Sequence, residues 1–584
     1  MKSKSIIGAA LAAIFTVGLT TSCEDMFNIE SNRVVYEYNH DLGSSADSVY
    51  TTTGILQCVR QIADRYVILG EVRGDMVDVN DLTKTSLRNL AEFNFEDENE
   101  YLNIRDYYAV INNCNYALAK MDTTLAHNNE RVMIDEYAAI LGIRAWTYMQ
   151  MGINYGEVPY FTEPITTVAD AEKDFPKYDI KGLAAELIPQ LIPYVDYDLP
   201  VFTSNGKRDY PVLQLVLADL YLWSGDYASA WATYWDYMTT HEDFSYAYGD
   251  TGNEEIFRGY MSIHAGAVKP SAFISSSIAT STTAAWDQYL YQGKGSNGYE
   301  NLSFITMEAT SAQGTVSEVA GLFFSLDNTH PLNPSAYYKE ICASQTYIKA
   351  SVDNKTNEKT GGYSVNVMAG GDQRRKFYTS TVSVNGEQSS EGFDKFSYIT
   401  AAAGEIEFYT PHINIYRRAI VYLRAAEALN ALAKEQGSDS LAVMSFNLLK
   451  DAYKVFFPQG HVLEEDLQEA FIGVHARGCG DVYLDTTNYV LNPDVIALRL
   501  YNNPEQAVNF NDTIDYIDEL IIDELAMEAT LEGNRFGDLI RFAERRGEPE
   551  FLAKRVASRK GKEHMNNDLY NMLLNKENWY LPIK

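Results

Sequence analysis

The sequence predicts a mainly α-helical protein, in which helix pairs form a scaffold and a long irregular insertion with short strands interrupts it. Three observations lead to this prediction. Apolar residues recur at helical spacing before about residue 244 and again after about residue 411. A short turn at 224–226 joins two such segments. Between about 245 and 410, Gly, Ser, Thr and Asn become frequent and the helical period fades.

The first 22 residues have the layout of a bacterial lipoprotein signal peptide. Lys2 and Lys4 precede an apolar run at 6–19 that is too short to span a bilayer comfortably, and small residues lead up to Cys23. We therefore expect Cys23 to become the lipidated first residue of the mature protein, followed by a tether over 23–45. The alternative is an ordinary secretory peptide with an incidental cysteine. No later run approaches the about 18 apolar residues that a membrane helix needs.

Two helices are predicted in the first part of the scaffold. Their apolar faces are formed by Tyr101, Ile104, Tyr108, Ile111 and Leu118, and by Tyr137, Leu141, Tyr148 and Met151. Arg144 lies inside the second stripe, where we expect it to pair with a carboxylate or with backbone carbonyls. Gly156 and Pro159 then end the second helix.

A helical hairpin is predicted at 210–240, with helices at 212–223 and 227–238 around the turn Ser224-Gly225-Asp226. The turn resembles the joint of a tetratricopeptide repeat, where small residues let paired helices pack closely. Trp223, Trp231 and Trp235 on this pair are expected in the core. A second pair is predicted at 414–434 and 439–456, and further helix at 513–545. We expect 46–584 to form one domain, with its scaffold at 46–244 and 411–584.

Short strands are predicted inside the insertion, at 363–368 and 376–384. The segment 293–298 matches G-x-G-x-x-G, but no helical pattern follows it, so we expect a surface loop and no dinucleotide cofactor. Asp75, Asp78, Asn80 and Asp81 form an oxygen-rich cluster. Its spacing is not that of an EF-hand, and a turn and capping cluster is expected in place of a calcium site.

Composition excludes some partners. A formal net charge of -33 and a pI near 4.6 argue against nucleic acid and against anionic lipid surfaces, and they fit a neutral or cationic ligand or a role in solubility alone. Four cysteines besides Cys23 are far apart: Cys58, Cys114, Cys342 and Cys479. They can form up to two disulfides or remain buried thiols, and their spacing does not suggest zinc.

No catalytic motif stands out: H-E-x-x-H and G-x-S-x-G are both absent, so we predict a protein that is not an enzyme. Other motifs do recur in a definite order. They are Arg144-Ala145-Trp146, Tyr155-Gly156-Glu157-Val158-Pro159-Tyr160, Tyr416-Arg417-Arg418, Leu423 to Asn430, Glu524, Glu528, Glu532-Gly533-Asn534-Arg535, Asp538-Leu539, Arg541 and Leu581-Pro582-Ile583. Behind a lipoprotein leader, this ordered set resembles the SusD/RagB family of Bacteroidetes surface lipoproteins.

The resemblance covers nearly the whole mature chain and implies four tetratricopeptide-like helix pairs, with a ligand face built from the irregular segments. It implies non-catalytic binding of a glycan or oligosaccharide at the outer membrane and delivery to a SusC-like TonB-dependent transporter. Glu24-Asp25 resembles the acidic stretch that sends such lipoproteins to the cell exterior. Peptide capture by the same scaffold and a lipid-anchored glycoside hydrolase are the alternatives. Leu525 departs from the family, which usually has Arg there.

The charged motif residues Glu532, Arg535, Asp538 and Arg541 alternate in sign at a spacing of three, so neighbours can pair, and we expect structural roles for them. Sugar binding needs an aromatic face flanked by amides, carboxylates or arginine. The predicted ligand residues are Trp286, Tyr289, Tyr291, Asn297 and Tyr299 in the insertion, with Arg73, Asp75 and Asn80 in an early loop that often contributes to the ligand face in this family. The alternative for each aromatic is packing onto the helices.

Overall fold

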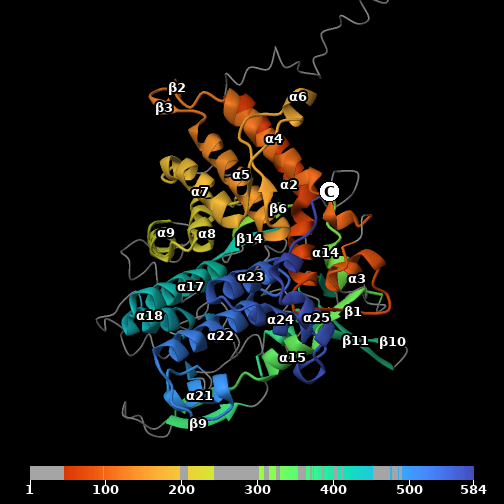
Figure 1. Ribbon diagram of the computed structural model, residues 1–584, viewed down its shortest axis with the longest axis vertical. Coiled ribbons are helices and arrows are strands. Elements are labelled where there is room, and N and C mark those ends of the chain that lie inside the picture. Colours follow the sequence, from red (N-terminus) through yellow and green to blue (C-terminus); the bar gives the residue numbers. More distant parts are fainter. Residues whose placement is uncertain are drawn as a thin grey trace, which may run out of the picture.

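The computed structural model shows an upper and a lower group of helices, with short strands between and beside them (Figure 1). It describes residues 45–95, 98–197, 208–241, 301–307, 315–323, 329–352, 363–368, 371–372, 374–384, 387–393, 395, 397–399, 406–408, 412–450, 455, 474–475, 484–485 and 489–583.

The helices from the first 241 residues form the upper group, apart from α3, which lies at the level of the lower group (Figure 1). They are α2 (Ser45–Val72), α3 (Thr85–Ala91), α4 (Arg105–Lys120), α5 (Ile134–Tyr155), α6 (Val168–Ala171), α7 (Ile180–Leu191), α8 (Leu213–Ser224) and α9 (Tyr227–Thr240), with 3-10 turns η2 (Glu100–Leu102) and η3 (Ile192–Tyr194). The predicted hairpin is α8 and α9. Gly225 joins them at φ +89°, which is unstrained only for glycine, and Asp226 caps α9 by accepting from the Ser229 amide.

The lower group comes mainly from the C-terminal part of the chain. It contains α17 (Arg418–Gln436), α18 (Asp439–Lys450), α21 (Pro493–Tyr501), α22 (Phe510–Glu528), α23 (Arg535–Arg546), α24 (Pro549–Ala557) and α25 (Asn567–Leu573), with η6 (Lys562–His564) and η7 (Lys576–Trp579). The short helices α14 (Val319–Phe323), α15 (Ala336–Ala343) and α16 (Arg375–Tyr378) come between the two groups in the sequence, and α15 lies beside the lower group, below α24 (Figure 1).

Successive helices pack as the antiparallel pairs α2–α4, α5–α7, α8–α9 and α17–α18. Contacts at two levels show the direction of a pair: Arg65 and Cys58 of α2 contact Asp106 and Asn113 of α4, and Arg144 and Gly152 of α5 lie against Gln190 and Leu183 of α7. The α9–α17 contact joins the upper pairs to the lower group. The prediction of a mainly helical protein with tetratricopeptide-like helix pairs is confirmed.

Strands are short and pair in twos and threes. They are β1 (Val77–Val79), β2 (Ala126–His127), β3 (Glu130–Arg131), β4 (Val158–Pro159), β5 (Lys177–Tyr178), β6 (Asn301–Thr306), β7 (Leu332–Pro334), β8 (Tyr347–Val352), β9 (Tyr363–Met368), β10 (Thr379–Val384), β11 (Glu387–Phe393), β12 (Ser397–Ile399), β13 (Ile406–Phe408), β14 (His412–Arg417) and β15 (Leu484–Asp485). The antiparallel pairs are β1–β7, β2–β3, β4–β5, β6–β14, β10–β11 and β12–β13, and β15, β8 and β9 form a three-stranded sheet.

Two predicted helices have different bounds in the structure. Residues 414–417 belong to β14, because this segment pairs with β6 at the junction of the two helix groups (Figure 1). The helix predicted at 513–545 is interrupted after Glu528, and Leu531 and Gly533 there have positive φ, at 64° and 81°. The strand predicted at 376–384 begins later, at Thr379, after the short helix α16.

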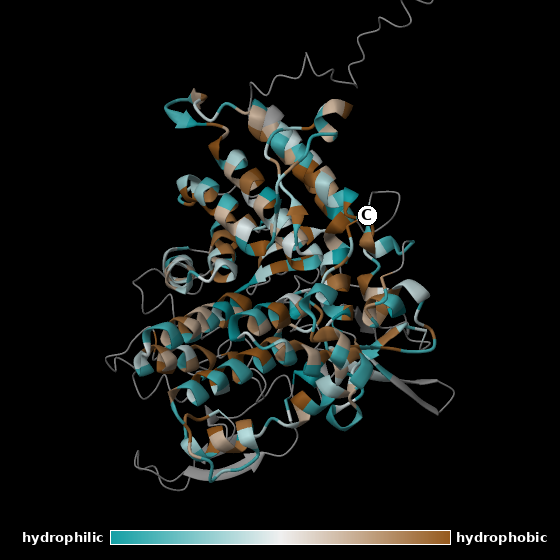
Figure 2. Cartoon of the chain, viewed as in Figure 1, coloured by the Kyte–Doolittle hydropathy of each residue, from teal (hydrophilic) through white to brown (hydrophobic). Residues whose placement is uncertain are grey.

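Buried apolar residues from Ile55 to Leu581 form one continuous core cluster. Apolar residues gather on inward helix faces and polar residues on outward faces (Figure 2). Trp223 is 6% exposed, as predicted for the core, while Trp231 and Trp235 are partly buried against it. Within the described residues, no helix is long and apolar enough to cross a membrane.

Candidate functional site

Most of the predicted ligand residues cannot be placed. Trp286, Tyr289, Tyr291, Asn297 and Tyr299 lie outside the described residues, as does the glycine-rich segment 293–298. Their assignment to the ligand face stays a prediction. The early-loop residues, by contrast, are all described.

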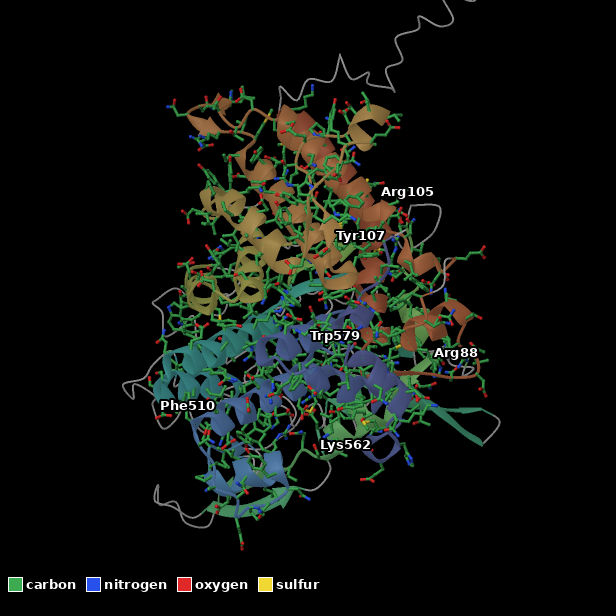
Figure 3. All side chains as sticks on the ribbon, viewed as in Figure 1. Arg88, Arg105, Tyr107, Phe510, Lys562 and Trp579 are labelled. Atoms are coloured by element: carbon green, nitrogen blue, oxygen red, sulfur yellow. The ribbon has the colours of Figure 1, made fainter. Side chains whose placement is uncertain are left out.

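Arg73 has a structural position, which corrects its prediction as a ligand residue. Its side chain is fully buried and donates to the backbone oxygens of Leu69 at 2.9 Å and Trp579 at 3.1 Å, and to the side chain of Asn154. Trp579 lies in the interior (Figure 3). Burial lowers the pKa of Arg73 to about 9. Arg73 thus fastens the C-terminal turn to α2 and α5, away from any surface ligand.

Asp75 is corrected for the same reason. It is fully buried and accepts two hydrogen bonds from the Arg535 guanidinium, at 2.6 and 2.7 Å. This bidentate pair links the end of α2 to the start of α23. It also corrects the predicted pairing of Arg535 with Glu532. Among the described residues, no group of three or more His, Cys, Asp or Glu side chains is placed to hold a metal ion.

Asn80 remains a candidate, because it is only half-buried. Its side-chain oxygen accepts from the Leu82 amide at 2.8 Å, which forms the turn expected of this cluster. Its amide nitrogen donates to the His330 carbonyl at 3.0 Å. Asn80 therefore ties the early loop to the segment that leads into β7, with β1 and β7 paired beside it.

The turn after Asn80 leads into a polar surface that we call the α3–α14 patch, formed by Lys84, Ser86, Glu100, Tyr101 and Glu318. Lys84 Nζ lies 3.0 Å from Glu100 Oε1 and 3.6 Å from Glu318 Oε2. The three charged side chains are 42–53% exposed. Ser86 donates to Glu100 at 3.0 Å and Tyr101 to Glu318 at 2.8 Å. The patch thus presents an ammonium group, a hydroxyl and two carboxylates to solvent.

These groups can pair with ligand hydroxyls, but they offer no ring for stacking. Tyr101 is only 3% exposed, and Lys84 Nζ sits 4.7 Å from the centre of its ring. Burial and then Glu318 raise the pKa of Tyr101 above its ordinary value, so its hydroxyl stays protonated and keeps donating. Leu82 and Val316 beside the patch are 56% and 41% exposed and add apolar surface.

Asp64 of α2 holds the α14 segment against the scaffold. Its carboxylate accepts from the Ser317 hydroxyl at 2.6 Å and from the Glu318 amide at 2.7 Å, just before α14 begins. Gln61, one turn earlier on α2, donates to Thr315. Burial raises the pKa of Asp64 to about 6, against these two hydrogen bonds. Asp64 and Gln61 of α2 therefore hold the insertion segment that brings Glu318 to the patch.

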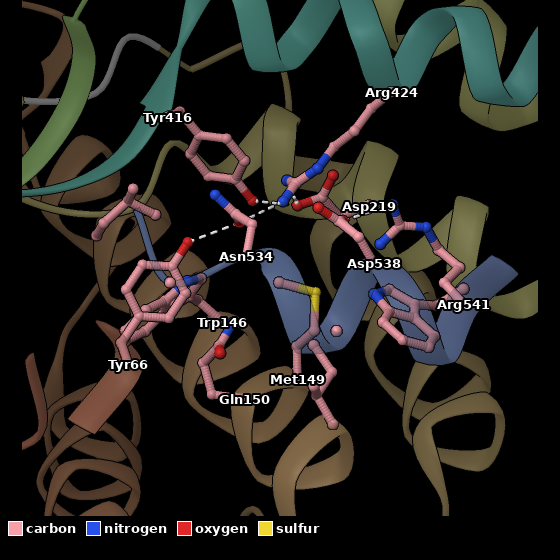
Figure 4. Close-up of a pocket in the computed structure, with 15 residues that line it drawn as sticks. Tyr66, Trp146, Met149, Gln150, Asp219, Tyr416, Arg424, Asn534, Asp538 and Arg541 are labelled. Carbon is pink, nitrogen blue, oxygen red and sulfur yellow. Dashed lines mark hydrogen bonds and ion pairs between the residues drawn. The ribbon is translucent and has the colours of Figure 1, made fainter. Parts of the chain in front are cut away.

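An internal cavity lies where the two helix groups meet (Figure 4). Water-sized molecules have about 30 Å³ of space in it, room for about two waters and far too little for a sugar ring. Its polar walls are already bonded: Tyr66 and Arg424 both donate to Asn534 at 2.8 Å, and Tyr416 donates to Asp219 at 2.7 Å. We assign this cavity to the packing of the two groups, and not to ligand binding.

A buried ion cluster fixes the insertion to the C-terminal helices. Arg374 donates to Asp372 at 2.6 and 2.9 Å, to Glu524 at 2.5 Å and to Glu528 at 2.7 Å. All four side chains are fully buried. Burial would raise the pKa of Glu524, but Arg374 and then His475, 2.7 Å away, hold it at about 2.

The same cluster continues at Glu532. Its carboxylate lies 2.7 Å from both Lys395 Nζ and Arg417 Nε, and Arg417 also contacts Glu528 at 2.7 Å. Burial lowers the pKa of Lys395, although Glu532 opposes this. Glu524, Glu528 and Glu532 were motif residues of the sequence, and their complete enclosure agrees with structural roles.

Two further charge predictions are settled by the geometry. Asp538 pairs with Arg541 at 2.8 Å, as the spacing of three predicts, and Arg541 also binds Glu427. Among the described residues, Arg144 pairs with neither a carboxylate nor a backbone carbonyl: it donates to the side-chain oxygens of Asn115 at 2.8 Å and Gln190 at 2.6 Å. The prediction for Arg144 was therefore wrong in the kind of partner.

The α3–α14 patch is not visible in the sequence. Lys84, Ser86 and Glu100 belong to no motif, and Tyr101 falls in the apolar stripe of a predicted helix. Glu318 comes from the insertion, 217 residues beyond Tyr101. The local signal was the predicted turn and capping cluster of Asp75, Asp78, Asn80 and Asp81, which comes just before Lys84 in the sequence.

Comparison with known proteins gives one family. A model described as the SusD family matches residues 225–584, well over half of the chain. No curated protein matches the chain.

Solved structures of SusD superfamily proteins share the fold. One from Bacteroides fragilis covers 91% of this chain and 94% of its own at a TM-score of 0.55 and 14% identity. One from Bacteroides vulgatus covers 93% and 96% at 0.53 and 12%. A third, from Bacteroides vulgatus and described as a SusD-like carbohydrate binding protein, covers 86% and 84% at 0.51 and 15%.

Proposed function

The chain belongs to the SusD family, and on that premise we propose that it binds an oligosaccharide at the cell surface without chemically altering it and delivers it to a SusC-like TonB-dependent transporter. Family membership is the observation that carries this proposal. The similar structure described as a carbohydrate binding protein supports the ligand class. Its 15% identity extends to the fold alone, so the glycan itself must come from experiment.

The α3–α14 patch supports surface binding in physical terms. Its ammonium, hydroxyl and carboxylate groups are exposed and held in place by one another, and such fixed polar groups pair with sugar hydroxyls. Since the patch lacks an exposed ring, we propose that the stacking partner comes from the insertion, with Trp286 as first candidate. Asn80 borders the patch and completes the proposed face.

We propose lipid anchoring through Cys23 and an outward-facing position in the outer membrane. The leader pattern supports the anchor, and Glu24-Asp25 supports export to the exterior. A Cys23→Ser chain should leave the membrane fraction, whereas the unchanged chain should stay in it and be cut by protease added to intact cells. Protection of the unchanged chain on intact cells would place it on the inner side.

The decisive experiment is binding of the chain from Glu24 onward to an array of polysaccharides and peptides, with the same wells assayed for released products. Selective glycan binding without products is the expected result. Peptide-only binding would favour the alternative of peptide capture, and product formation would favour a lipid-anchored glycoside hydrolase.

A pair of lysine variants locates the site. Lys84→Ala should weaken binding of the glycan found on the array, because it removes the cation of the patch. Lys554→Ala removes an equally accessible lysine from α24 and should leave binding unchanged. Equal affinity of all three proteins would remove the α3–α14 patch from the proposal while leaving glycan binding itself intact.

A further inference from the structure

Two cysteines lie on neighbouring helices of the scaffold. Cys58 is on α2 and Cys114 is on α4, and both are free thiols. Cys114 is completely buried, whereas Cys58 is half-buried and packs against the core from the side. The oligosaccharide proposal uses neither residue.

The packing of α2 against α4 fixes which residues face each other. Arg65 of α2 pairs with Asp106 of α4, and its guanidinium lies 5.7 Å from the ring centre of Tyr107. Figure 3 shows Tyr107 near the start of α4. Because the helices are antiparallel, moving back along α2 corresponds to moving forward along α4.

The two cysteines lie two helical turns further along this interface. Seven residues, about two turns of helix, separate Arg65 from Cys58 and Tyr107 from Cys114. The register is confirmed at this level by Asn113, whose side-chain nitrogen is 3.8 Å from Cys58 Sγ. Cys58 and Cys114 therefore lie at the same level of the α2–α4 interface, and Asn113, the residue before Cys114, contacts the Cys58 sulfur.

We propose that Cys58 and Cys114 form a reversible disulfide that cross-links α2 to α4 when the protein meets a low-molecular-weight disulfide oxidant. The Cys58 thiolate attacks one sulfur of the oxidant, and one thiolate leaves, giving a mixed disulfide on Cys58. Cys114 then loses its proton to solvent, attacks the Cys58 sulfur and expels the second thiolate. The two protein thiols are oxidised, and the small disulfide is reduced to two thiols.

The environment of the pair sets the order and rate of these steps. Cys58 is the accessible thiol, so it reacts first. Burial raises the pKa of Cys114 to about 12; the Arg144 guanidinium on α5 opposes this rise, and Cys58 adds to it. Burial also raises the pKa of Cys58. Exchange should therefore be slow at neutral pH and faster in alkaline buffer. An exported protein would meet oxidants of this class outside the cytoplasm.

The test treats the full chain, purified in detergent, with oxidised glutathione at pH 7 and pH 9, followed by alkylation of remaining thiols and tryptic mapping without reduction. Cleavage after Arg33, Arg60, Arg105 and Lys120 yields peptides 34–60 and 106–120. The expected product is these two peptides joined and two hydrogen atoms lighter than their sum, formed at least tenfold faster at pH 9. Dithiothreitol should separate them again.

Two variants keep the result interpretable. In Cys114→Ser the reaction should stop at glutathione on Cys58, and in Cys58→Ser the Cys114 thiol should stay unmodified, with the circular dichroism of both unchanged. The buried Cys342 on α15 serves as the internal control and should stay reduced. A glutathione adduct on Cys58 that persists in the unchanged chain beside an intact Cys114 thiol would overturn the proposal. So would a joined peptide that forms only after denaturation.

Discussion

Arg374→Met should loosen the insertion at the strands that follow Arg374. Methionine keeps much of the side-chain length but cannot donate a hydrogen bond. The change removes all of the hydrogen bonds that the guanidinium makes to Asp372, Glu524 and Glu528. Because the acceptors are fully buried, water cannot replace these bonds without opening the structure.

The size of the effect follows from what each carboxylate retains. Removing one partner of a buried ion pair costs about 3–5 kcal/mol. Glu524 keeps His475 at 2.7 Å, and Glu528 keeps Arg417 at 2.7 Å. Asp372 loses its bidentate side-chain partner but keeps the backbone amide of residue 374 at 2.9 Å. We therefore expect a value at the lower end, about 3 kcal/mol, which is about a hundredfold in the local opening equilibrium.

Native-state hydrogen exchange measures this local opening directly. Amide protection in peptides from 374–384 and 387–393, which contain β10 and β11, should fall about a hundredfold. Arg374→Lys keeps the charge and should recover part of this protection. Helices α8 and α9, which do not touch the cluster, should keep their protection.

Arg545→Met is the matched control. Arg545 is similarly buried and donates to Asp518 at 2.9 and 3.0 Å, but it joins α22 to α23 inside the scaffold. Its loss should affect those helices and spare β10 and β11. If Arg374→Met leaves the strands protected, or if both variants loosen them equally, the ion cluster does not specifically hold the insertion.

Three further predictions test separate features. Because the pKa of Asp64 is raised to about 6, its contribution to stability is present below about pH 4 and is lost as the pH rises through about 6. The midpoint temperature of unfolding should therefore change less between about pH 4 and about pH 6 in Asp64→Asn than in the unchanged protein. Parallel plots of midpoint temperature against pH would contradict this. Gly70→Ala would put a Cβ 2.0 Å from the Gly533 carbonyl oxygen and should cost about 3 kcal/mol or more in thermal unfolding, whereas Gly54→Ala, with nothing within 4 Å, should be neutral or slightly stabilising. Trp286→Ala should weaken glycan binding in titration calorimetry without lowering the unfolding temperature, and an unchanged affinity would remove Trp286 from the site.

The parts of the fold that local signals define were predicted well. The turn at Gly225 has a residue that tolerates positive φ and an Asp that caps the next helix, so the α8–α9 hairpin was visible in the sequence. The second pair was visible from the break before Ser438. By contrast, 414–417 continues an apolar pattern into α17 but is drawn into pairing with β6, about 110 residues earlier in the chain.

The interruption after Glu528 was missed although its signal was present. Gly533-Asn534 is a turn-forming pair, but it follows a long helical pattern and was counted with it. The interruption between α22 and α23 has a structural consequence: it brings Glu532 to Lys395 and Arg417 and places Gly533 against α2.

The candidate site was less predictable, because partners far away in the sequence determine which of its residues are buried and which are exposed. Arg73 and Asp75 follow a helix in a polar segment that looks exposed, yet they bind Trp579 and Arg535, 506 and 460 residues away. No residue pattern near Arg73 or Asp75 in the sequence predicts those partners. In the same way, Lys84 becomes part of the α3–α14 patch only because the insertion brings Glu318 beside it.

The contact of α2 with the bend after α22 has a consequence for how the protein is made. Glu71 accepts a hydrogen bond from the Gly533 amide, 462 residues later. At ordinary synthesis rates of about 5–20 residues per second, roughly 20–90 seconds pass between the synthesis of these two residues. Throughout that time α2 has no final partner for this face, and an incomplete chain cannot supply one. We expect unfinished chains to be prone to aggregation and quickly degraded, because α2 lacks its partner for this face until Gly533 has been synthesised.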